Sequence, residues 1–302
     1  NTMRYRDFYQ IDAVAISDET AAIVPQINLS KDVVEVGELE NLGPNVNSRY
    51  SELAPVIAHD GRTLYFTREN HPQNYGVQNI WFSEMDSSGN FQPAQNIGAP
   101  LNTAYHSFAI SILPDDNSML VGNVYHPDGR QTEGFSMTYR QGDTWSFPEK
   151  LEVEDYYNNA RGSYALASNG KILVLSVDRR DGLGGNDLYV SFLQENGKWS
   201  VPKNLGSDIN TTDSEDSPYL AADGVTLYFS SSGHKGYGSN DIFVTRRLDD
   251  TWQKWSEPVN LGPKINTRGW DAYFTVTASG DYAYFVSSRK GSEDIYRVKL
   301  PA

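Results

Sequence analysis

The chain has 302 residues, a net charge of −14 at pH 7 and no cysteine. Asp and Glu number 39 against 25 Lys and Arg, which argues against a nucleic-acid binder, because phosphate neutralisation needs an excess of cations. Without Cys there is no disulfide framework, no thiolate metal site and no cysteine nucleophile. No stretch of 18 apolar residues occurs, so we predict no membrane-spanning helix.

The chain repeats a phrase in which Asn-Leu-Gly or Asn-Ile-Gly is followed by a further Asn. The phrase begins at Asn41, Asn96, Asn204 and Asn260, which we call the anchor asparagines. The asparagines that end each phrase, which we call the marker asparagines, are Asn47, Asn102, Asn210 and Asn266. Because one spacing is double the others, we expect a degenerate fifth copy that ends at Asn158.

Each repeat contains four short segments in which aromatic and β-branched residues alternate. In the fourth repeat these segments are 217–221, 226–230, 241–245 and 255–258, with an Asp-Gly turn between the first two. This pattern predicts antiparallel strands, and four strands per repeat of this length are typical of a propeller blade. Tryptophans recur at the outer strand (Trp145, Trp199 and Trp255), and we expect them to pack between blades.

The repeats predict an all-β fold, a five-bladed β-propeller of four-stranded antiparallel blades. We expect the blades at about 47–98, 102–152, 158–206, 210–262 and 266–300. The last repeat lacks an outer strand, so we predict that the N-terminal segment 32–41 supplies it and closes the ring. Closure of this kind removes exposed sheet edges. Residues 31–302 would then form the propeller, and residues 1–30 an N-terminal arm.

Three phrases carry a resemblance to known proteins. They are Asp-Gly-Val-Thr-Leu-Tyr-Phe-Ser-Ser at 223–231, Gly-Gly-Asn-Asp-Leu-Tyr-Val-Ser at 184–191, and the segment from Trp255 to Asn266. They resemble the TolB-like, WD-type propeller repeats of bacterial envelope proteins. The resemblance is greatest to propellers that precede an OmpA-like peptidoglycan-binding domain, one of which belongs to type IX secretion. It implies a periplasmic or outer-membrane-associated scaffold that binds protein or glycan, has no cofactor and is not an enzyme.

An aspartate opens the third strand of several repeats, at Asp187, Asp241 and Asp294. Such a carboxylate could bind a metal ion, but a short side chain at a strand start more often accepts backbone N–H bonds from the preceding loop. We therefore predict a structural role and no metal site.

The residues five positions after each marker asparagine begin the first strand of each blade, which lines the central channel. They are Glu52, Ser107, Ser163, Glu215 and Asp271, and Trp270 lies beside the last of them. We predict that these residues stand at the channel mouth and that no residue of the chain is catalytic. The alternative is a five-bladed glycoside hydrolase, because Glu52, Glu215 and Asp271 come from neighbouring blades and could supply its carboxylates.

The loops between the second and third strands all carry a cation and should emerge on one face. With their aromatic neighbours they predict a rim that binds an envelope protein or an anionic peptide or glycan through Arg-carboxylate contacts and aromatic packing. We call the following set the rim residues: Arg68, Tyr75, Arg130, Arg179, Arg180, His234, Lys235, Tyr237, Arg289 and Lys290.

Overall fold

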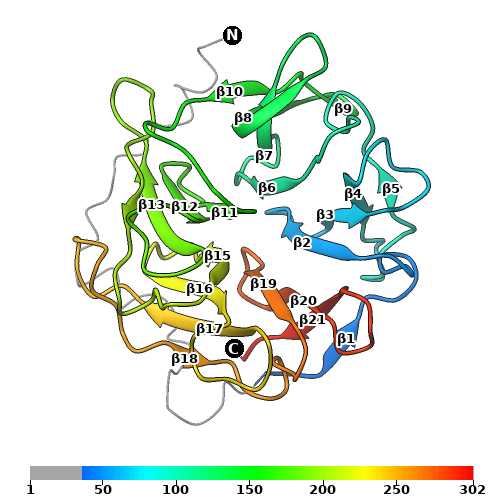
Figure 1. Ribbon diagram of the computed structural model, residues 1–302. Coiled ribbons are helices and arrows are strands. Elements are labelled where there is room, and N and C mark those ends of the chain that lie inside the picture. Colours follow the sequence, from blue (N-terminus) through cyan, green and yellow to red (C-terminus); the bar gives the residue numbers. More distant parts are fainter. Residues whose placement is uncertain (1–35, 302) are drawn as a thin grey trace.

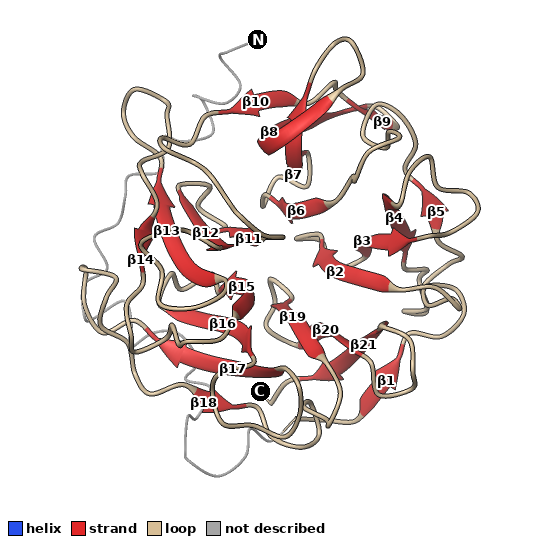
Figure 2. Ribbon diagram, in the orientation of Figure 1, coloured by secondary structure: helices blue, strands red, loops and turns tan. Residues whose placement is uncertain are grey.

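The computed structural model describes residues 36–301, in which five antiparallel sheets surround a central channel (Figure 1). Each sheet is a blade with four strands, which follow the sequence from the channel outward in the first four blades, and a fifth short strand joins the second blade. The described residues contain strands, turns and loops and no helix (Figure 2). This part of the chain therefore has no helix that could cross a membrane. The predicted all-β, five-bladed propeller is confirmed.

The strands of the first three blades are β2 (Glu52–Ile57), β3 (Thr63–Glu69), β4 (Gln78–Glu84), β5 (Gln95–Asn96), β6 (Ala109–Ile112), β7 (Ser118–Tyr125), β8 (Gln131–Gln141), β9 (Thr144–Trp145), β10 (Glu149–Leu151), β11 (Ser163–Leu166), β12 (Ile172–Val177), β13 (Asp187–Phe192) and β14 (Lys203–Asn204). The strands of the last two blades are β15 (Glu215–Leu220), β16 (Thr226–Ser231), β17 (Asp241–Arg246), β18 (Val259–Asn260), β19 (Asp271–Val276), β20 (Tyr282–Ser287), β21 (Asp294–Lys299) and β1 (Leu39–Asn41).

The ring is closed by β1, which pairs antiparallel with β21 as the outer strand of the fifth blade. Figure 1 shows this blue strand beside the red C-terminal strand. Glu40 of β1 forms an ion pair of 2.6 Å with Arg297 of β21. The predicted closure is thus confirmed, with the strand itself beginning at Leu39. Residues 32–35 of the predicted closing segment, and the predicted arm 1–30, lie outside the described residues.

The marker asparagines fasten each blade to the next. The side chain of Asn266 accepts a hydrogen bond from the backbone N of Ile242 at 2.7 Å and donates to its carbonyl at 2.9 Å. It also donates to the anchor Asn260 at 2.9 Å. The same three bonds recur at Asn47, Asn102 and Asn210. A buried peptide group needs such partners, which explains why the phrase returns at four of the five blade junctions. The expected fifth marker, Asn158, does not form these bonds and instead accepts hydrogen bonds from the backbone N of Ala160 and of Asp178.

The repeated aspartate completes this network. Asp241 accepts a hydrogen bond from the anchor Asn260 at 2.8 Å and from the backbone N of Tyr237 at 2.5 Å. Asp187 and Asp294 accept the equivalent bond from their anchors, Asn204 and Asn41. Among the described residues, no group of three His, Asp or Glu side chains could hold a metal ion. These bonds account for the aspartates as structural residues.

The core is divided among the spaces between neighbouring blades. Trp199 of the third blade is fully buried in a cluster that includes Phe135 of the second. The Trp145 ring meets Tyr65 of the first blade edge to face, with their centroids 6.1 Å apart. Burial of a large apolar side chain stabilises a fold by roughly 1.5–3 kcal/mol. The outer-strand tryptophans therefore hold the blades together, as their recurrence predicts.

Candidate functional site

The first strands of the five blades surround a channel with a volume of about 700 Å³. Its wall is largely apolar and aromatic and includes Phe108, Tyr164, Tyr219 and Tyr273. Burial raises the pKa of Tyr219 and Tyr273 to about 12, so both hydroxyls are neutral at physiological pH. A cavity of this size with an apolar wall and a few polar groups is the usual form of a small-ligand site.

Three of the first strands share a bulge at the same position. Ala54, Ser217 and Tyr273 have φ of 48°, 51° and 59°, in the left-handed region that non-glycine residues rarely adopt. The strand ladders shift register at these residues. Bulges redirect side chains and are frequent beside functional sites. All three residues line the channel, so the bulges shape its wall.

On one side of the channel a carboxylate is held in a fixed position. Glu69, at the end of β3, accepts a hydrogen bond of 2.5 Å from the side-chain amide of Gln78, at the start of β4. The side-chain oxygen of Gln78, Oε1, lies 3.1 Å from Nδ1 of His106, and Glu69, Gln78 and His106 all line the channel. The carbonyl of His106 in turn accepts a 2.7 Å bond from Asn123. This hydrogen-bonded series orients the Glu69 carboxylate at the junction of the first two blades.

A second carboxylate comes from the second blade. Its strands β7 and β8 are 8 and 11 residues long, against at most 7 residues in the strands of the other blades, and Glu133 of β8 lines the channel. Close by, the hydroxyls of Tyr156 and Tyr164 are 2.8 Å apart. Burial, together with the Glu133 charge, raises the pKa of both tyrosines. The sequence differs here too: the third strand of the last three repeats opens with Asp187, Asp241 or Asp294, whereas the second repeat has Gly134-Phe135-Ser136 at this place.

Two further residues complete the polar part of the lining. Arg161 is the only Lys or Arg of the described residues that lines the channel, and it is exposed. Trp270 also lines the channel, and its ring meets Tyr273 with centroids 5.9 Å apart. A flat aromatic ring beside carboxylates and a guanidinium is a combination that binds polar ring-shaped ligands such as sugars.

The acids predicted at the channel mouth are not there. Glu52, Glu215 and Asp271 are fully buried, and none of them lines the channel. Glu52 instead accepts hydrogen bonds from the backbone N and Oγ of Ser48, at 3.0 and 2.6 Å. Glu215 and Asp271 accept the same pair of bonds from Thr211 and Thr267. Burial raises the pKa of Glu52 and Glu215, but neither side chain can reach a substrate in the channel. Ser107 and Ser163, which occupy this position in the second and third blades, are also buried. Ser163 lines the channel and Ser107 does not.

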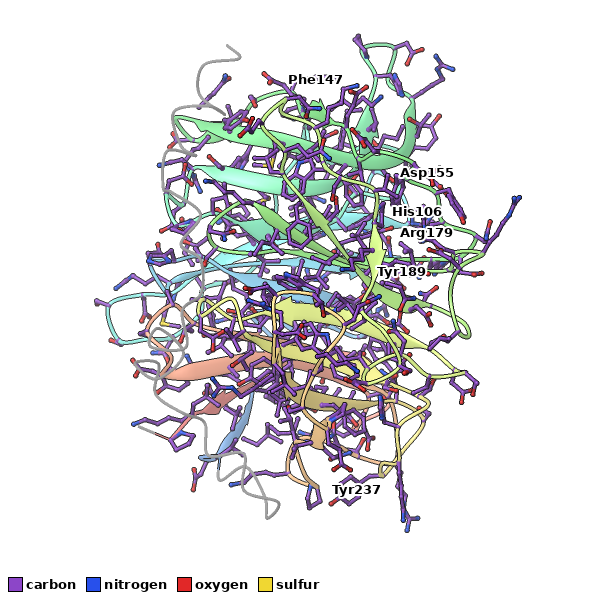
Figure 3. All side chains as sticks on the ribbon, turned by 90° about the vertical axis from the view of Figure 1, so that its left-hand side faces the viewer. His106, Phe147, Asp155, Arg179, Tyr189 and Tyr237 are labelled. Atoms are coloured by element: carbon purple, nitrogen blue, oxygen red, sulfur yellow. The ribbon has the colours of Figure 1, made fainter. Side chains whose placement is uncertain are left out.

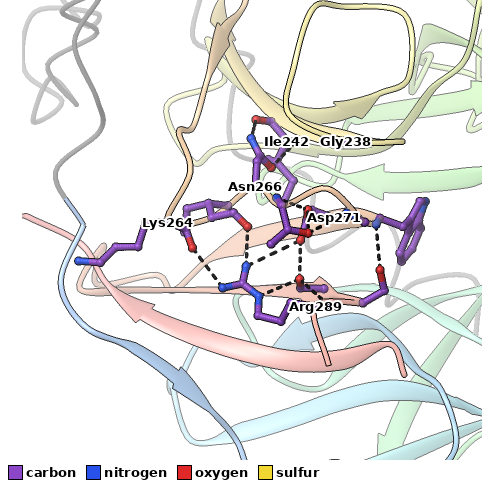
Figure 4. A network of polar contacts seen from close by, with 12 residues as sticks. Gly238, Ile242, Lys264, Asn266, Asp271 and Arg289 are labelled. Carbon is purple, nitrogen blue, oxygen red and sulfur yellow. Dashed lines mark hydrogen bonds and ion pairs between the residues drawn. The ribbon is translucent and has the colours of Figure 1, made fainter. Parts of the chain in front are cut away.

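Several predicted rim cations turn out to be the partners of these acids. Arg68 is buried, donates to Glu52 at 2.8 Å and donates to the carbonyl of Val46 at 2.6 Å. Arg289 lies 3.7 Å from Asp271 and donates to the carbonyl of Ile265 at 2.6 Å (Figure 4). In the fourth blade His234 contacts the equivalent carbonyl, that of Ile209, at 2.6 Å, and its charge acts on Glu215. We call each pair an acid–cation couple.

The other two blades support this interpretation. In the second blade the acid is replaced by the neutral Ser107, and a neutral hydroxyl replaces the cation, since Tyr125 donates to the carbonyl of Leu101 at 2.8 Å. In the third blade Arg179 is buried against Tyr157, with 4.2 Å between guanidinium carbon and ring centroid, and pairs with Asp155 and Asp181. A buried acid at this position thus always has a cation beside it, and where a serine replaces the acid the cation is either absent or paired with other acids, as expected where a buried charge needs a partner.

The predicted basic rim is therefore corrected in part. Arg68, Arg179 and Arg289 were expected as solvated loop residues, but their side chains are only 5%, 4% and 16% exposed. His234 is half-buried. The remaining rim residues are exposed: Tyr75, Arg130, Arg180, Lys235, Tyr237 and Lys290. Figure 3 shows that the labelled His106 and Tyr237 lie toward the same side of the propeller. None of the exposed rim residues lines the channel, and their role in partner binding stays a prediction.

The sequence matches no protein-family model and no curated protein. Among solved structures, one described as a glycoside hydrolase aligns with 95% of this chain and 96% of its own, at 8% identity and a TM-score of 0.61. The catalytic domain of an α-L-arabinofuranosidase from Coprinopsis cinerea aligns with 88% of this chain and 97% of its own, at 11% identity and a TM-score of 0.58. A protein from Agrobacterium tumefaciens described as TolB aligns with 83% of this chain and 77% of its own, at 16% identity and a TM-score of 0.46.

These comparisons correct the functional prediction. The expected non-enzymatic scaffold is contradicted, because propellers that align with most of the chain, these two among them, are described as glycosidases. The TolB-like resemblance extends to the propeller fold and no further. At these identities the likeness concerns the fold alone, so the function must be argued from the channel.

Proposed function

We propose that the protein is a glycoside hydrolase that admits part of a glycan to its central channel. One observation carries the proposal: Glu69 and Glu133, from neighbouring blades, line the same channel of about 700 Å³, which Trp270 lines as well. Most glycosidases need two carboxyl groups that flank the bond to be broken. The fold of this chain is shared with proteins described as glycosidases, which is consistent with the proposal.

The surroundings of the two carboxyl groups assign their roles. Glu69 accepts a hydrogen bond from the Gln78 amide, which holds the orientation of its carboxylate group. It therefore suits the base or the nucleophile. Glu133 is exposed, forms no hydrogen bond within the described residues and lies near the hydroxyl pair of Tyr156 and Tyr164. It is the candidate for the general acid that protonates the leaving oxygen.

The rest of the lining would bind the sugar. Trp270 offers a ring face to the C–H groups of a sugar, while Arg161 and Asn158 offer donors to its hydroxyl groups. The neutral hydroxyls of Tyr164 and Tyr273 lie deeper in the wall. Because this lining needs no metal ion or cofactor to supply two carboxyl groups, we propose that hydrolysis uses these side chains alone.

The test is a hydrolysis screen against aryl glycosides and polysaccharides, with α-L-arabinofuranosides included because one similar structure acts on them by its description. We expect Glu69→Gln and Glu133→Gln each to lower the rate at least about 100-fold. The matched control is Glu84→Gln, since Glu84 is an exposed residue at the end of β4 that does not line the channel. The proposal is wrong if the wild type hydrolyses nothing in the screen, or if hydrolysis survives both substitutions.

The location of the protein is a separate proposal. The motifs that resemble TolB-like repeats support a periplasmic or outer-membrane-associated protein, and a link to an OmpA-like domain or to secretion rests on the same motifs. Fractionation of the producing cells, followed by immunoblotting, would test it. Recovery in the cytosolic fraction would contradict it.

A further inference from the structure

Three exposed apolar side chains lie together at the junction of the first two blades. Tyr75, Val77 and Tyr105 are 61%, 48% and 45% exposed. The other large apolar side chains that are exposed in the described chain come from separate places in the sequence: Phe147, Leu183, Val201, Tyr237 and Leu248. Single exposed apolar residues are normal, whereas a group of them marks a binding surface. We call Tyr75, Val77 and Tyr105 the aromatic platform.

The platform is held in shape by its backbone. A Cβ on Gly76 would lie 2.7 Å from the carbonyl oxygens of both Ala104 and Tyr105, so only glycine allows the two loops to pack this closely. The backbone N of Tyr75 donates to the side chain of Asn79 at 2.8 Å, and that of Tyr105 donates to Thr103 at 3.1 Å. The backbones of two loops from different blades, each carrying a tyrosine, are thereby fixed beside each other, while both tyrosine side chains remain open to solvent. A preorganised surface loses less entropy when a ligand binds.

The platform continues into the channel. Tyr105 belongs to both, because it lines the channel and is nearly half exposed. Val77 precedes Gln78, whose amide holds the Glu69 carboxylate, and Tyr105 precedes His106, which contacts Gln78. A ligand that leaves the channel next to Glu69 would therefore pass over Tyr105 and Tyr75.

We propose that the aromatic platform is a subsite for the part of a glycan chain that extends out of the channel, and that the substrate is an uncharged polysaccharide or long oligosaccharide. Tyrosine rings bind sugar rings through their faces while the phenol oxygen stays hydrated. The platform has no charged member, and a protein of net charge −14 repels a polyanion. This inference rests on the proposed function only in placing one end of the glycan in the channel, because binding of a glycan by the platform does not require hydrolysis.

Affinity gel electrophoresis with arabinan, xylan and mixed-linkage glucan measures binding without catalysis, and Glu69→Gln can serve as the background. We expect retardation by at least one of these polysaccharides. The change Tyr75→Ala/Tyr105→Ala should weaken it by about 10- to 100-fold, from the stacking of two aromatic rings. The matched control is Tyr237→Ala, because Tyr237 occupies the same place before a glycine in the fourth blade and is 51% exposed, but it lies outside the channel lining.

Kinetics separates the platform from the catalytic proposal. In the wild-type background Tyr75→Ala, at a residue outside the channel lining, should raise the KM for the polysaccharide and leave that for a short aryl glycoside within about twofold. Binding without any hydrolysis would sustain the platform and refute the proposed function. Hydrolysis with equal polysaccharide affinity in the double variant and the control would refute the platform. Failure of all three polysaccharides to retard the wild type would also overturn it.

Discussion

The acid–cation couple of the first blade can be tested by removing its cation. Arg68→Met keeps an apolar stem against Trp81, whose ring centroid lies 4.2 Å from the guanidinium carbon, but leaves Glu52 buried without its ion-pair partner. Both side chains are almost fully buried, so water screens the pair little. Breaking such a pair by removal of one member costs about 3–5 kcal/mol. At about 2–4 °C per kcal/mol for a large domain, the melting temperature should fall by roughly 6–20 °C.

The cost should depend on pH in a defined direction. Burial raises the pKa of Glu52 above its ordinary 4.5, while Ser48 and Arg68 lower it, so the loss of Arg68 raises it further. A carboxyl group whose pKa is raised by folding stabilises the folded state when protonated, below about pH 4.5, and loses this effect as the pH rises through its folded pKa. The difference between Arg68→Met and the wild type should therefore be small near pH 4 and widen toward pH 8.

Urea unfolding at pH 4 to 8 measures this difference, and Glu52→Gln/Arg68→Met is the matched control. The double variant buries no charge, so it should be more stable than Arg68→Met at neutral pH. Its difference in stability from the wild type should not widen as the pH rises. Equal stability of the single and double variants at pH 8 would refute a buried charge as the cause. A difference in stability between Arg68→Met and the wild type that does not change with pH would also refute it.

Three further predictions follow from the described contacts. Asn47→Ala removes the partner of both backbone groups of Ile295 and should destabilise the fold by about 2–4 kcal/mol, measured by urea unfolding; a loss below about 0.5 kcal/mol would show that the marker is dispensable. Gly122→Ala places a Cβ 2.0 Å from the ring of Phe108, so that ring must move within the channel wall; a glycan bound in the channel should bind more weakly, and unchanged binding and stability would contradict this contact. Truncation through Asn41 exposes the edge of the fifth blade and should cause aggregation, measured by light scattering; a monodisperse protein with an unchanged melting temperature would exclude the closing role.

The architecture could be predicted because its signals are local in the sequence. The anchor and marker asparagines lie six residues apart, and each of these four markers binds the backbone of the blade before it, so the phrase recurs at four of the five places where two blades meet. Strand alternation and Asp-Gly turns are likewise properties of short segments. The closing strand followed from counting, since five first strands were present and one outer strand was missing.

The site could not be predicted in the same way, because it depends on the direction of individual side chains. Glu52 was found from its position in the repeat and assigned to the channel, yet it points into the blade and pairs with Arg68 across the β2–β3 ladder. The strand changes register after Leu53 at the left-handed Ala54, and a shift of one residue exchanges the two faces of a strand. No residue type in the sequence indicates that bulge.

Glu69 and Glu133 illustrate what only the tertiary structure decided. Neither belongs to a repeated motif, and they are 64 positions apart in the sequence. They line one channel because the blades curve into a ring and because the β7–β8 hairpin is longer than its counterparts. The sequence by itself determined how many blades form and how they are joined, since those contacts repeat with the chain. Ring closure and strand bulges decided which carboxyl groups are buried with a cation and which face the channel. Both act between residues that lie far apart in the sequence.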